Sequence, residues 1–359
     1  MVELKEGQVE KIISHRPTLT KVKLKIGDQI KSAINYDQLS GAIEVGDKVI
    51  VNTTATALNL GTGGYDFIVY ILGKEQSLAD KGHIMKLRYS PYQVQTCAMA
   101  EQQSSYHQQF SNLDSLEGTP VIVGTLHSML AAIITVIKAK HPETKVAYIM
   151  TDAAALPLAL SDLVYQLQRL KLLDLTVTSG HAFGGEIEAV NIYTALLGAY
   201  LQKADIIIVT MGPGIVGTGT KYGFSGTEQA DILNAVSNLD GVPIAVPRIN
   251  FSDTRARHYG LSHHSKTNLG ELVLSKALLG IPKFRGEKKT LIQKQLKKTG
   301  IIDKHQVLFK SKEEVISELE KTDINLTTMG SSYNEVPEYF ITAALSGVIA
   351  LEQLASDSN

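Results

Sequence analysis

From residue 120 onward, short apolar runs alternate with helical patterns, and this alternation restricts the fold more than any other feature of the chain. The runs are PVIVGT at 120–125, KVAYIM at 145–150, LDLTVTS at 173–179, ADIIIVT at 204–210 and VPIAVPRI at 242–249. Nearly continuous β-branched strands are typical of a parallel sheet buried on both faces, and their alternation with helices is typical of α/β proteins. We therefore predict, over 83–359, an α/β domain with a Rossmann-like, doubly wound, mostly parallel sheet.

The first 72 residues have a different pattern, with short, partly alternating runs separated by Gly, Asp and Pro. In EVGDKVIVN, at 44–52, Gly-Asp marks a tight turn between apolar strands. This pattern predicts a small N-terminal β-barrel of the OB or SH3-like kind over 1–72. It lacks the aromatic residues beside lysines that single-strand-binding barrels use, which favours a structural or docking role. The polar segment 73–82 is the predicted linker.

Composition excludes several classes of protein. The formal net charge of −1 gives no overall field that favours nucleic acid or acidic membranes. The single cysteine, Cys97, excludes an internal disulfide and a four-cysteine zinc site. The start of the chain is charged, unlike a signal peptide, and the apolar run 129–137 is too short to span a bilayer. We expect a cytoplasmic protein without a membrane or nucleic-acid partner, and a homodimer on general grounds.

The run 282–300 holds seven basic residues and one acidic residue. A run of this kind contacts nucleic acid in some proteins. A solvated helix face is the commoner outcome, and it is the interpretation that we favour.

Unusual polar residues follow the predicted strands directly. They include His127 after the first strand, Asp152 after the second and His181 after the third. Because the carboxyl ends of parallel strands meet at one edge of a sheet, these loops predict a single ligand site there. Asp152 is also a candidate helix N-cap, and that interpretation stays open.

The loop MGPGIVGTGT, at 211–220, contains G-x-G-x-x-G at Gly212, Gly214 and Gly217, followed by Thr218 and Gly219. Glycines at such a place let backbone amides approach an anion. A dinucleotide site is not favoured, because the next helix starts about eight residues later and no acidic residue ends the next strand. The alternative is a glycine-rich turn packed closely against the strands.

The stretch NFSDTRARHYGLSHHSKT, at 250–267, combines an acid, two arginines and three histidines. Arg255 and Arg257 share a face in extended chain, and arginine binds carboxylate or phosphate with two parallel hydrogen bonds. The candidate metal ligands are Asp152, His181, Asp253, His263 and His264, although no spacing matches a known metal signature. The adjacent histidines reach one site more easily from a bent loop than from a helix.

Several motifs together resemble one family. They include TDAAALPLALSDL at 151–163, GHAFGGEIEAVN at 180–191, MGPGIVGTGT at 211–220 and SDTRARHYGLSHHS at 252–265. They are similar to an uncharacterised bacterial family, catalogued as a domain of unknown function, over nearly the whole chain. The resemblance implies a bacterial cytoplasmic protein and assigns no activity and no residue role.

The residues favour an enzyme that acts on a small anionic substrate, of the hydrolase or transferase class, with a divalent metal as an option. Asp152, His181, His258, His263 and His264 are the candidate acid–base or metal residues. The candidate substrate-binding residues are His127, Gly212, Gly214, Gly217, Thr218, Gly219, Arg255 and Arg257. The alternative is a non-catalytic nucleotide or metabolite binding module with the barrel as its interaction domain. A single site requires His181 and His263 to share a cleft, within about two strand spacings of each other.

Overall fold

The computed structural model describes residues 1–78 and 82–357, and it divides them into two compact units. The first unit contains the chain up to residue 78 together with Met85–Thr96, and the second contains Gly82–Ile84 and the chain from Cys97 onward. Residues 79–81 of the predicted linker and the terminal residues 358–359 lie outside the described residues. The first unit therefore extends past the predicted linker, because Met85–Thr96, which follow the linker in the sequence, belong to the first unit.

The first unit is a closed five-stranded barrel, as predicted for this part of the chain. Its strands are β1 (Leu4–Arg16), β2 (Leu19–Ile26), β3 (Gln29–Tyr36), β4 (Lys48–Asn52) and β5 (Tyr65–Ile71), in the order β1-β2-β3-β5-β4. Two short helices lie between them, α1 (Asp37–Ser40) and α2 (Thr54–Ala57). Alternate residues such as Val22 and Leu24 point inward and fill the barrel with aliphatic side chains. A small two-stranded sheet of β6 (Ile84–Lys86) and β7 (Val94–Thr96) follows.

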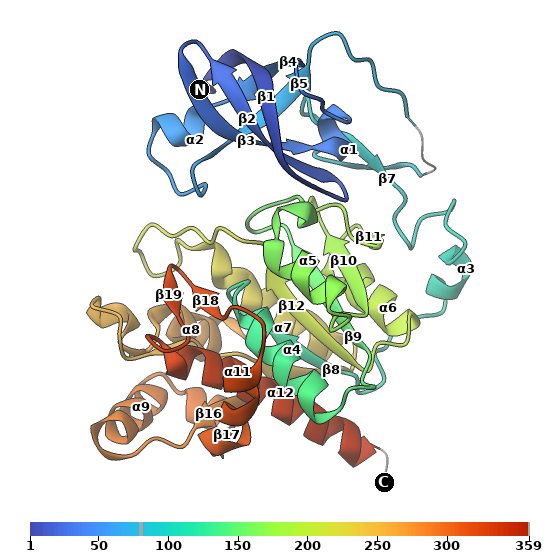
Figure 1. The fold of residues 1–359 in the computed structure, drawn as a ribbon. Coiled ribbons are helices and arrows are strands. Elements are labelled where there is room, and N and C mark those ends of the chain that lie inside the picture. The colour runs from blue at the N-terminus through green and yellow to red at the C-terminus, as the bar shows by residue number, and fades with distance from the viewer. Residues whose placement is uncertain (79–81, 358–359) are drawn as a thin grey trace. The chain divides into compact units, whose positions relative to one another are not determined.

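The second unit is built on an eight-stranded parallel sheet (Figure 1), which confirms the predicted α/β class. Its strands are β8 (Pro120–Val123), β9 (Val146–Thr151), β10 (Leu175–Ser179), β11 (Ile187–Ala189), β12 (Ile206–Met211), β13 (Val242–Ala245), β16 (Leu278–Pro282) and β17 (Gln306–Lys310). Their order across the sheet is β11-β10-β9-β12-β8-β13-β16-β17. The central strands β8, β9 and β12 are buried along their whole length because both faces of the sheet are covered.

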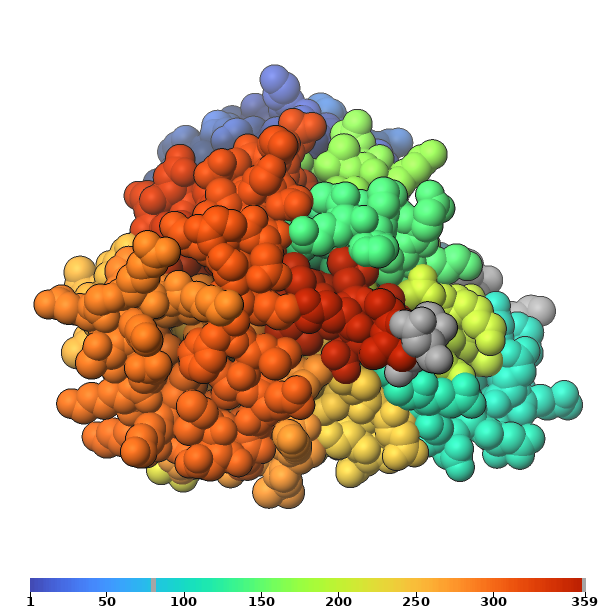
Figure 2. Space-filling model, turned by 90° about the horizontal axis from the view of Figure 1, so that it is seen from below, coloured from blue at the N-terminus to red at the C-terminus, as the bar shows by residue number. Residues whose placement is uncertain are grey.

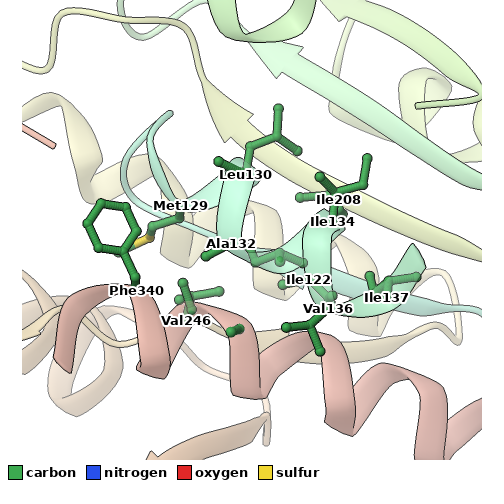
Figure 3. Close-up of a cluster of buried hydrophobic side chains, with 14 of the residues drawn as sticks. Ile122, Met129, Leu130, Ala132, Ile134, Val136, Ile137, Ile208, Val246 and Phe340 are labelled. Atoms are coloured by element: carbon green, nitrogen blue, oxygen red, sulfur yellow. The ribbon is translucent and has the colours of Figure 1, made fainter. Parts of the chain in front are cut away.

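Helices cover both faces of this sheet. One face carries α4 (Met129–Lys140), α5 (Asp162–Arg169), α11 (Ile316–Lys321) and α12 (Pro337–Asp357). The other carries α6 (Ile192–Leu201), α7 (Glu228–Asn238), α9 (Gly286–Lys298) and α10 (Ile301–Lys304). The strands divide their side chains between the two cores: Ile122 of β8 packs under α4 (Figure 3), whereas Val121 and Val123 face the opposite side. A short helix, α3 (His107–Phe110), precedes the sheet.

Helix α12 is long and apolar enough to cross a membrane by length and composition. However, 72% of its most apolar window is buried inside the protein. It packs against α4 and β16, and Phe340 fills the core beside Met129 and Val246 (Figure 3). In Figure 2 its carboxyl end, in red, lies between the orange segments that follow β16 and the green end of α4. Helix α12 is therefore a core helix, and the apolar run 129–137 belongs to α4, against which α12 packs.

The connections after β12 and β13 position the candidate site. Strand β8 lies between these two strands, and it leads to α4 on one face, whereas β12 leads to α7 on the other. Connections that diverge to opposite faces leave a crevice outside the carboxyl ends of the strands. The chain after β13 forms a small hairpin of β14 (Ile249–Asn250) and β15 (Gly260–Leu261) and then α8 (His263–Thr267). A second small hairpin, β18 (Thr327–Thr328) with β19 (Ser331–Ser332), precedes α12.

Candidate functional site

Three histidines form the centre of the candidate site. His258 lies in the β14–β15 connection, and His263 and His264 are the first two residues of α8. One ring nitrogen from each lies within 4.8 Å of the others, and this is the one group of potential metal ligands found in residues 1–78 and 82–357. The ring centroids of His263 and His264 are 4.2 Å apart.

Two neighbours hold these rings together. The Ser262 hydroxyl is the N-cap of α8, where it accepts a hydrogen bond from the His264 backbone N–H, and it also bonds to His258 Nδ1 at 2.9 Å. Phe224 stacks on His264 with ring centroids 4.0 Å apart and lies edge-on to His263. The expectation that adjacent histidines need a bent loop was therefore wrong: the first turn of a helix brings both rings together when one aromatic ring packs against them.

The surroundings of the three imidazoles favour their neutral form. Burial lowers the pKa of His258 to about 4 and that of His264 to about 3, and burial also lowers the pKa of His263. The positive charges of nearby arginines act in the same direction. Arg257 Nε–H donates to His258 Nε2 at 3.3 Å, so the proton of this ring lies on Nδ1 and is donated to Ser262. The remaining lone pair of His258, on Nε2, thus accepts the Arg257 bond and is open to another ligand only if that bond breaks.

Arginines surround the histidines. The side chain of Arg248, which follows β13 closely, is buried, and its Nη2 lies 3.6 Å from Asp253 Oδ2. Asp253 also holds Arg255 by two side-chain hydrogen bonds, at 2.9 and 2.8 Å. These bonds keep the pKa of the Asp253 carboxyl well below its usual range. Asp253 therefore serves to orient arginines, and the structure does not place it among the potential metal ligands.

A small cavity of about 100 Å³ joins these groups. Its lining includes the three histidines, Arg248, Arg255 and Arg257, with Gly217, Gly219, Phe224 and Met329 closing it. Gly219 has a φ of +81°, and a Cβ at this position would lie 3.1 Å from Arg257 Nη1. The glycine thus lets the loop after β12 lie directly on the guanidinium group. The cavity has room for an ion and the head of a small ligand.

Asp152 and His181 lie elsewhere along the sheet edge. Asp152 Oδ2 accepts a hydrogen bond of 2.8 Å from the His181 backbone N–H. A Cβ on Gly180 would lie 2.2 Å from the same carboxylate, so this close approach requires glycine. His181 follows β10 and His263 comes after β13, and three strands separate these two in the sheet. Neither Asp152 nor His181 lines the cavity, so the expectation of one cleft that contains His181 and His263 was wrong.

His127 takes part in a separate polar network. Its Nε2 lies 2.6 Å from Ser161 Oγ and its Nδ1 lies 3.0 Å from the Tyr148 hydroxyl, which bonds in turn to Thr210. Burial lowers the pKa of His127 to about 4. Both ring nitrogens have protein partners, so the ring links β8, β9 and the start of α5 and is not exposed to the cavity.

The predicted glycine-loop residues have different positions. Gly217 and Gly219 line the cavity. A Cβ on Gly212 would lie 2.5 Å from the Ala155 carbonyl oxygen, so this glycine permits close packing of two loops. Gly214 faces open space, and Thr218 bonds to Thr220 and Gly223 within its own loop. Of the literal G-x-G-x-x-G motif, only the last glycine lines the cavity.

Sequence reasoning missed four residues of the site: Arg248, Phe224, Ser262 and Met329. Two of them carried a signal. Arg248 comes soon after a buried strand, where ligand-binding residues gather in such sheets. Ser262 directly precedes the histidine pair, as an N-cap precedes a helix. Phe224 and Met329 lie at least 34 positions from each of the three histidines, and no local pattern connects them.

The fold and the site together define a class: an α/β protein with an N-terminal closed barrel and a histidine–arginine cavity at the carboxyl edge of its sheet. The chain belongs to the family described as "Protein of unknown function (DUF3866)", whose model matches residues 32–347. No curated protein matches the chain. The family match runs from β3 of the barrel to nearly the end of the α/β unit. It confirms the resemblance to a family of unknown function over nearly the full length.

Proposed function

We propose that this protein is an enzyme of the hydrolase or transferase class that binds a divalent metal and a small anionic substrate in the histidine–arginine cavity. One observation carries the proposal. Three neutral imidazoles with nitrogens within 4.8 Å of one another and three guanidinium groups line the same cavity of about 100 Å³.

The ligand set fits a catalytic metal. Three histidines with an open fourth position are a known arrangement for catalytic zinc, and imidazole also binds iron, nickel and copper. His258, His263 and His264 would hold such a metal if their ring nitrogens moved closer together than the 4.8 Å within which they now lie. His258 already donates its Nδ1–H to Ser262, as metal-bound histidines donate to a neighbouring acceptor. Its Nε2 becomes available when Arg257 turns away toward a substrate.

The arginines determine what binds beside the metal. Three positive side chains repel a lone cation, and an anion bound at the same time offsets this repulsion. Metal and anion are therefore expected to bind cooperatively. Arginine forks suit carboxylate or phosphate oxygens. The volume of about 100 Å³ accommodates the anionic head of a substrate, while the rest of the molecule extends outward past Met329, which is 64% exposed.

The chain's own groups suggest how the reaction is assisted. A bound metal supplies polarisation of the substrate oxygen and activation of water. Arg255, held by Asp253, provides a fixed positive charge, and Arg257 moves from His258 to the anion. Guanidinium groups held close to developing negative charge stabilise a transition state.

A non-catalytic binding module is the second candidate. One observation favours it: the cavity lining contains no Asp or Glu among the residues that the structure describes. Without a metal, such a site has no carboxylate to act as a general base. It would then bind an anionic metabolite, with the barrel as the interaction domain.

Measuring turnover in the presence and absence of metal distinguishes the proposed enzyme from the non-catalytic binding module. Purified protein would be assayed on phosphomonoesters and carboxylic esters with added Zn²⁺ or Mn²⁺, together with Arg257→Ala and the surface control Lys203→Ala. The proposal predicts metal-dependent turnover that Arg257→Ala reduces at least tenfold and Lys203→Ala leaves unchanged. Thermal stabilisation by anions without any turnover would support the binding module instead.

Several finer expectations belong to this proposal. Five strands in a closed barrel support an OB-like assignment, and the diverging connections beside β8 support a Rossmann-like use of the sheet. The bacterial source, the cytoplasmic location and the homodimer stay predictions.

A further inference from the structure

A second crevice lies at the carboxyl ends of β16 and β17. Strand β16 leads to α9 on one face of the sheet, whereas β17 leads to α11 on the other. The same divergence of connections that places the histidine site therefore occurs again here. A cavity of about 950 Å³ opens between the start of α9, the start of α11 and the start of α12. It shares no lining residue with the histidine cavity.

This cavity is strongly basic. Its lining includes five cationic side chains, Lys283, Arg285, Lys288, Lys289 and Lys312, against Glu313 and Glu338. Glu338 is paired with Lys288, and Glu313 bonds to the Ser311 hydroxyl. Within the described part of the chain, the side chains of Lys283, Arg285, Lys289 and Lys312 form no ion pair or hydrogen bond. Glu313 offsets part of the charge of Lys312 and Arg285. Five cationic side chains against two carboxylates still leave the cavity positive, and a positive cavity attracts a polyanion.

The start of α9 adds neutral donors to these charges. Arg285 is its N-cap, and an arginine side chain cannot accept the hydrogen bonds of the first-turn amides. These amides carry the positive end of the helix dipole, and Arg285, Lys288 and Lys289 from this end of the helix line the cavity. An anion bound by the basic side chains thus also finds backbone donors.

The cavity also has an aromatic wall. Phe284, Phe309 and Tyr333 line it beside aliphatic residues such as Ile292 and Ile341. Phe309 is 37% exposed, which is unusual for a phenylalanine in a strand and leaves its ring available. Aromatic side chains in a basic groove stack on nucleic-acid bases. A volume of about 950 Å³ lies within the range of small-molecule sites.

We propose that this basic cavity binds a nucleotide, with its phosphates on Arg285, Lys312 and the start of α9 and its base against Phe309 and Tyr333. The site is separate from the proposed catalytic cavity and does not depend on it. The proposal assigns a function to the beginning of the basic run 282–300, whose side chains line the cavity. The later lysines of the run lie on a solvated helix face, as expected from the sequence.

Calorimetric titration of the full chain tests this proposal. The probes are ATP, inorganic tripolyphosphate, adenosine and a short single-stranded RNA. The variants are Arg285→Ala/Lys312→Ala, Phe309→Ala and the control Lys297→Ala, which removes a charge from the same helix outside the cavity. Thermal unfolding and circular dichroism establish that each variant is folded, and His264→Ala shows whether the histidine site contributes.

The expected result is saturable ATP binding that weakens at least tenfold in Arg285→Ala/Lys312→Ala and several-fold in Phe309→Ala. Lys297→Ala and His264→Ala retain ATP binding. Equal binding of tripolyphosphate and ATP, with no effect of Phe309→Ala, would overturn the nucleotide in favour of any polyanion. The proposal would also be overturned if the RNA binds more tightly than ATP. The same holds if Lys297→Ala weakens ATP binding as much as Arg285→Ala/Lys312→Ala does.

Discussion

Ser262 shows how much of the site depends on one hydroxyl group. The same oxygen caps α8, which carries His263 and His264, and holds the ring of His258. Without this acceptor, His258 loses the bond that fixes which nitrogen carries the proton. Ser262 therefore acts as a positioning residue for all three histidines.

Replacing this serine tests that role. We expect Ser262→Ala to weaken zinc binding by about 10–100-fold, because partners of metal-bound histidines have effects of this size. Ser262→Thr retains the hydroxyl and should restore most of the affinity. Zinc titration with a competing chelator provides the measurement, with Thr254→Ala in the same stretch as control. Equal loss in the Thr and Ala variants would mean that the defect is steric and that the hydroxyl has no role.

Glu228 provides a prediction about pH. Its carboxyl accepts a hydrogen bond of 2.7 Å from the Thr151 hydroxyl, and burial raises its pKa to about 7. Because the folded-state pKa exceeds the unfolded value, the folded protein favours the protonated form. The resulting stability is fully present below about pH 4.5 and is lost as the pH rises through about 7.

Glu228→Gln removes this titration while keeping an oxygen for Thr151. We expect the variant to be more stable than the native protein by about 1–3 kcal/mol at pH 8, with the difference vanishing near pH 4. Urea unfolding at both pH values measures this. A constant difference across the range would contradict the assigned pKa.

At the scale of elements, the loop after β12 shows which parts of a motif matter. Gly214 and Gly219 both have a positive φ, but only Gly219 lies against Arg257. The sequence predicted a glycine-rich loop at this edge of the sheet, and Gly217 and Gly219 of this loop line the histidine–arginine cavity. The literal G-x-G-x-x-G pattern also selected Gly212, which packs against Ala155. The spacing of glycines identifies a turn. Which of these glycines is required depends on atoms of distant segments that a Cβ at that position would contact.

The two glycines form a matched pair for experiment. Alanine at either position introduces similar backbone strain, but only Gly219→Ala displaces the Arg257 guanidinium. We expect Gly219→Ala to weaken binding of inorganic phosphate, measured by calorimetry with Zn²⁺ present, several-fold more than Gly214→Ala does. Equal weakening of phosphate binding by both variants would mean that Arg257 does not contact the anion.

Helix starts show the same limit of local patterns. Ser311 and Glu314 form the capping box that their spacing predicts. Ser225 and Glu228 have the same spacing but form none, because Glu228 bonds to Thr151 and α7 begins at Glu228. A local rule fails where a residue finds a stronger partner on another element.

At the scale of the whole molecule, the composition of the strands predicted a covered parallel sheet but not its order. Asp152, His181 and the histidines of 258–264 all follow strands, as predicted, yet β12 and β8 separate β9 from β13. Strand order depends on how the helices pack across both faces, which residue spacing does not record. The candidate site therefore occupies only the part of the sheet edge that follows β13, and Asp152 and His181 lie outside it.

Helix α12 connects distant parts of the α/β unit, because it packs on α4 and β16. Phe340, fully buried, fills the space between α12 and α4 (Figure 3). We expect Phe340→Ala to reduce the free energy of unfolding by about 3–5 kcal/mol. Ile302→Ala, at a position 40% exposed, should change it much less. Denaturant unfolding compares them, and similar losses in both variants would contradict the role of α12 as a core helix.

The most direct test of the central claim is the metal content of the protein purified without chelator. Elemental analysis would compare the native chain with His264→Ala and with His141→Ala, an exposed histidine at the end of α4. The histidine–arginine site predicts about one equivalent of a transition metal in the native chain and in His141→Ala, and its loss in His264→Ala. Metal absent from all three, even after addition of Zn²⁺ with phosphate, or equal metal in all three, would contradict a metal site at His258, His263 and His264.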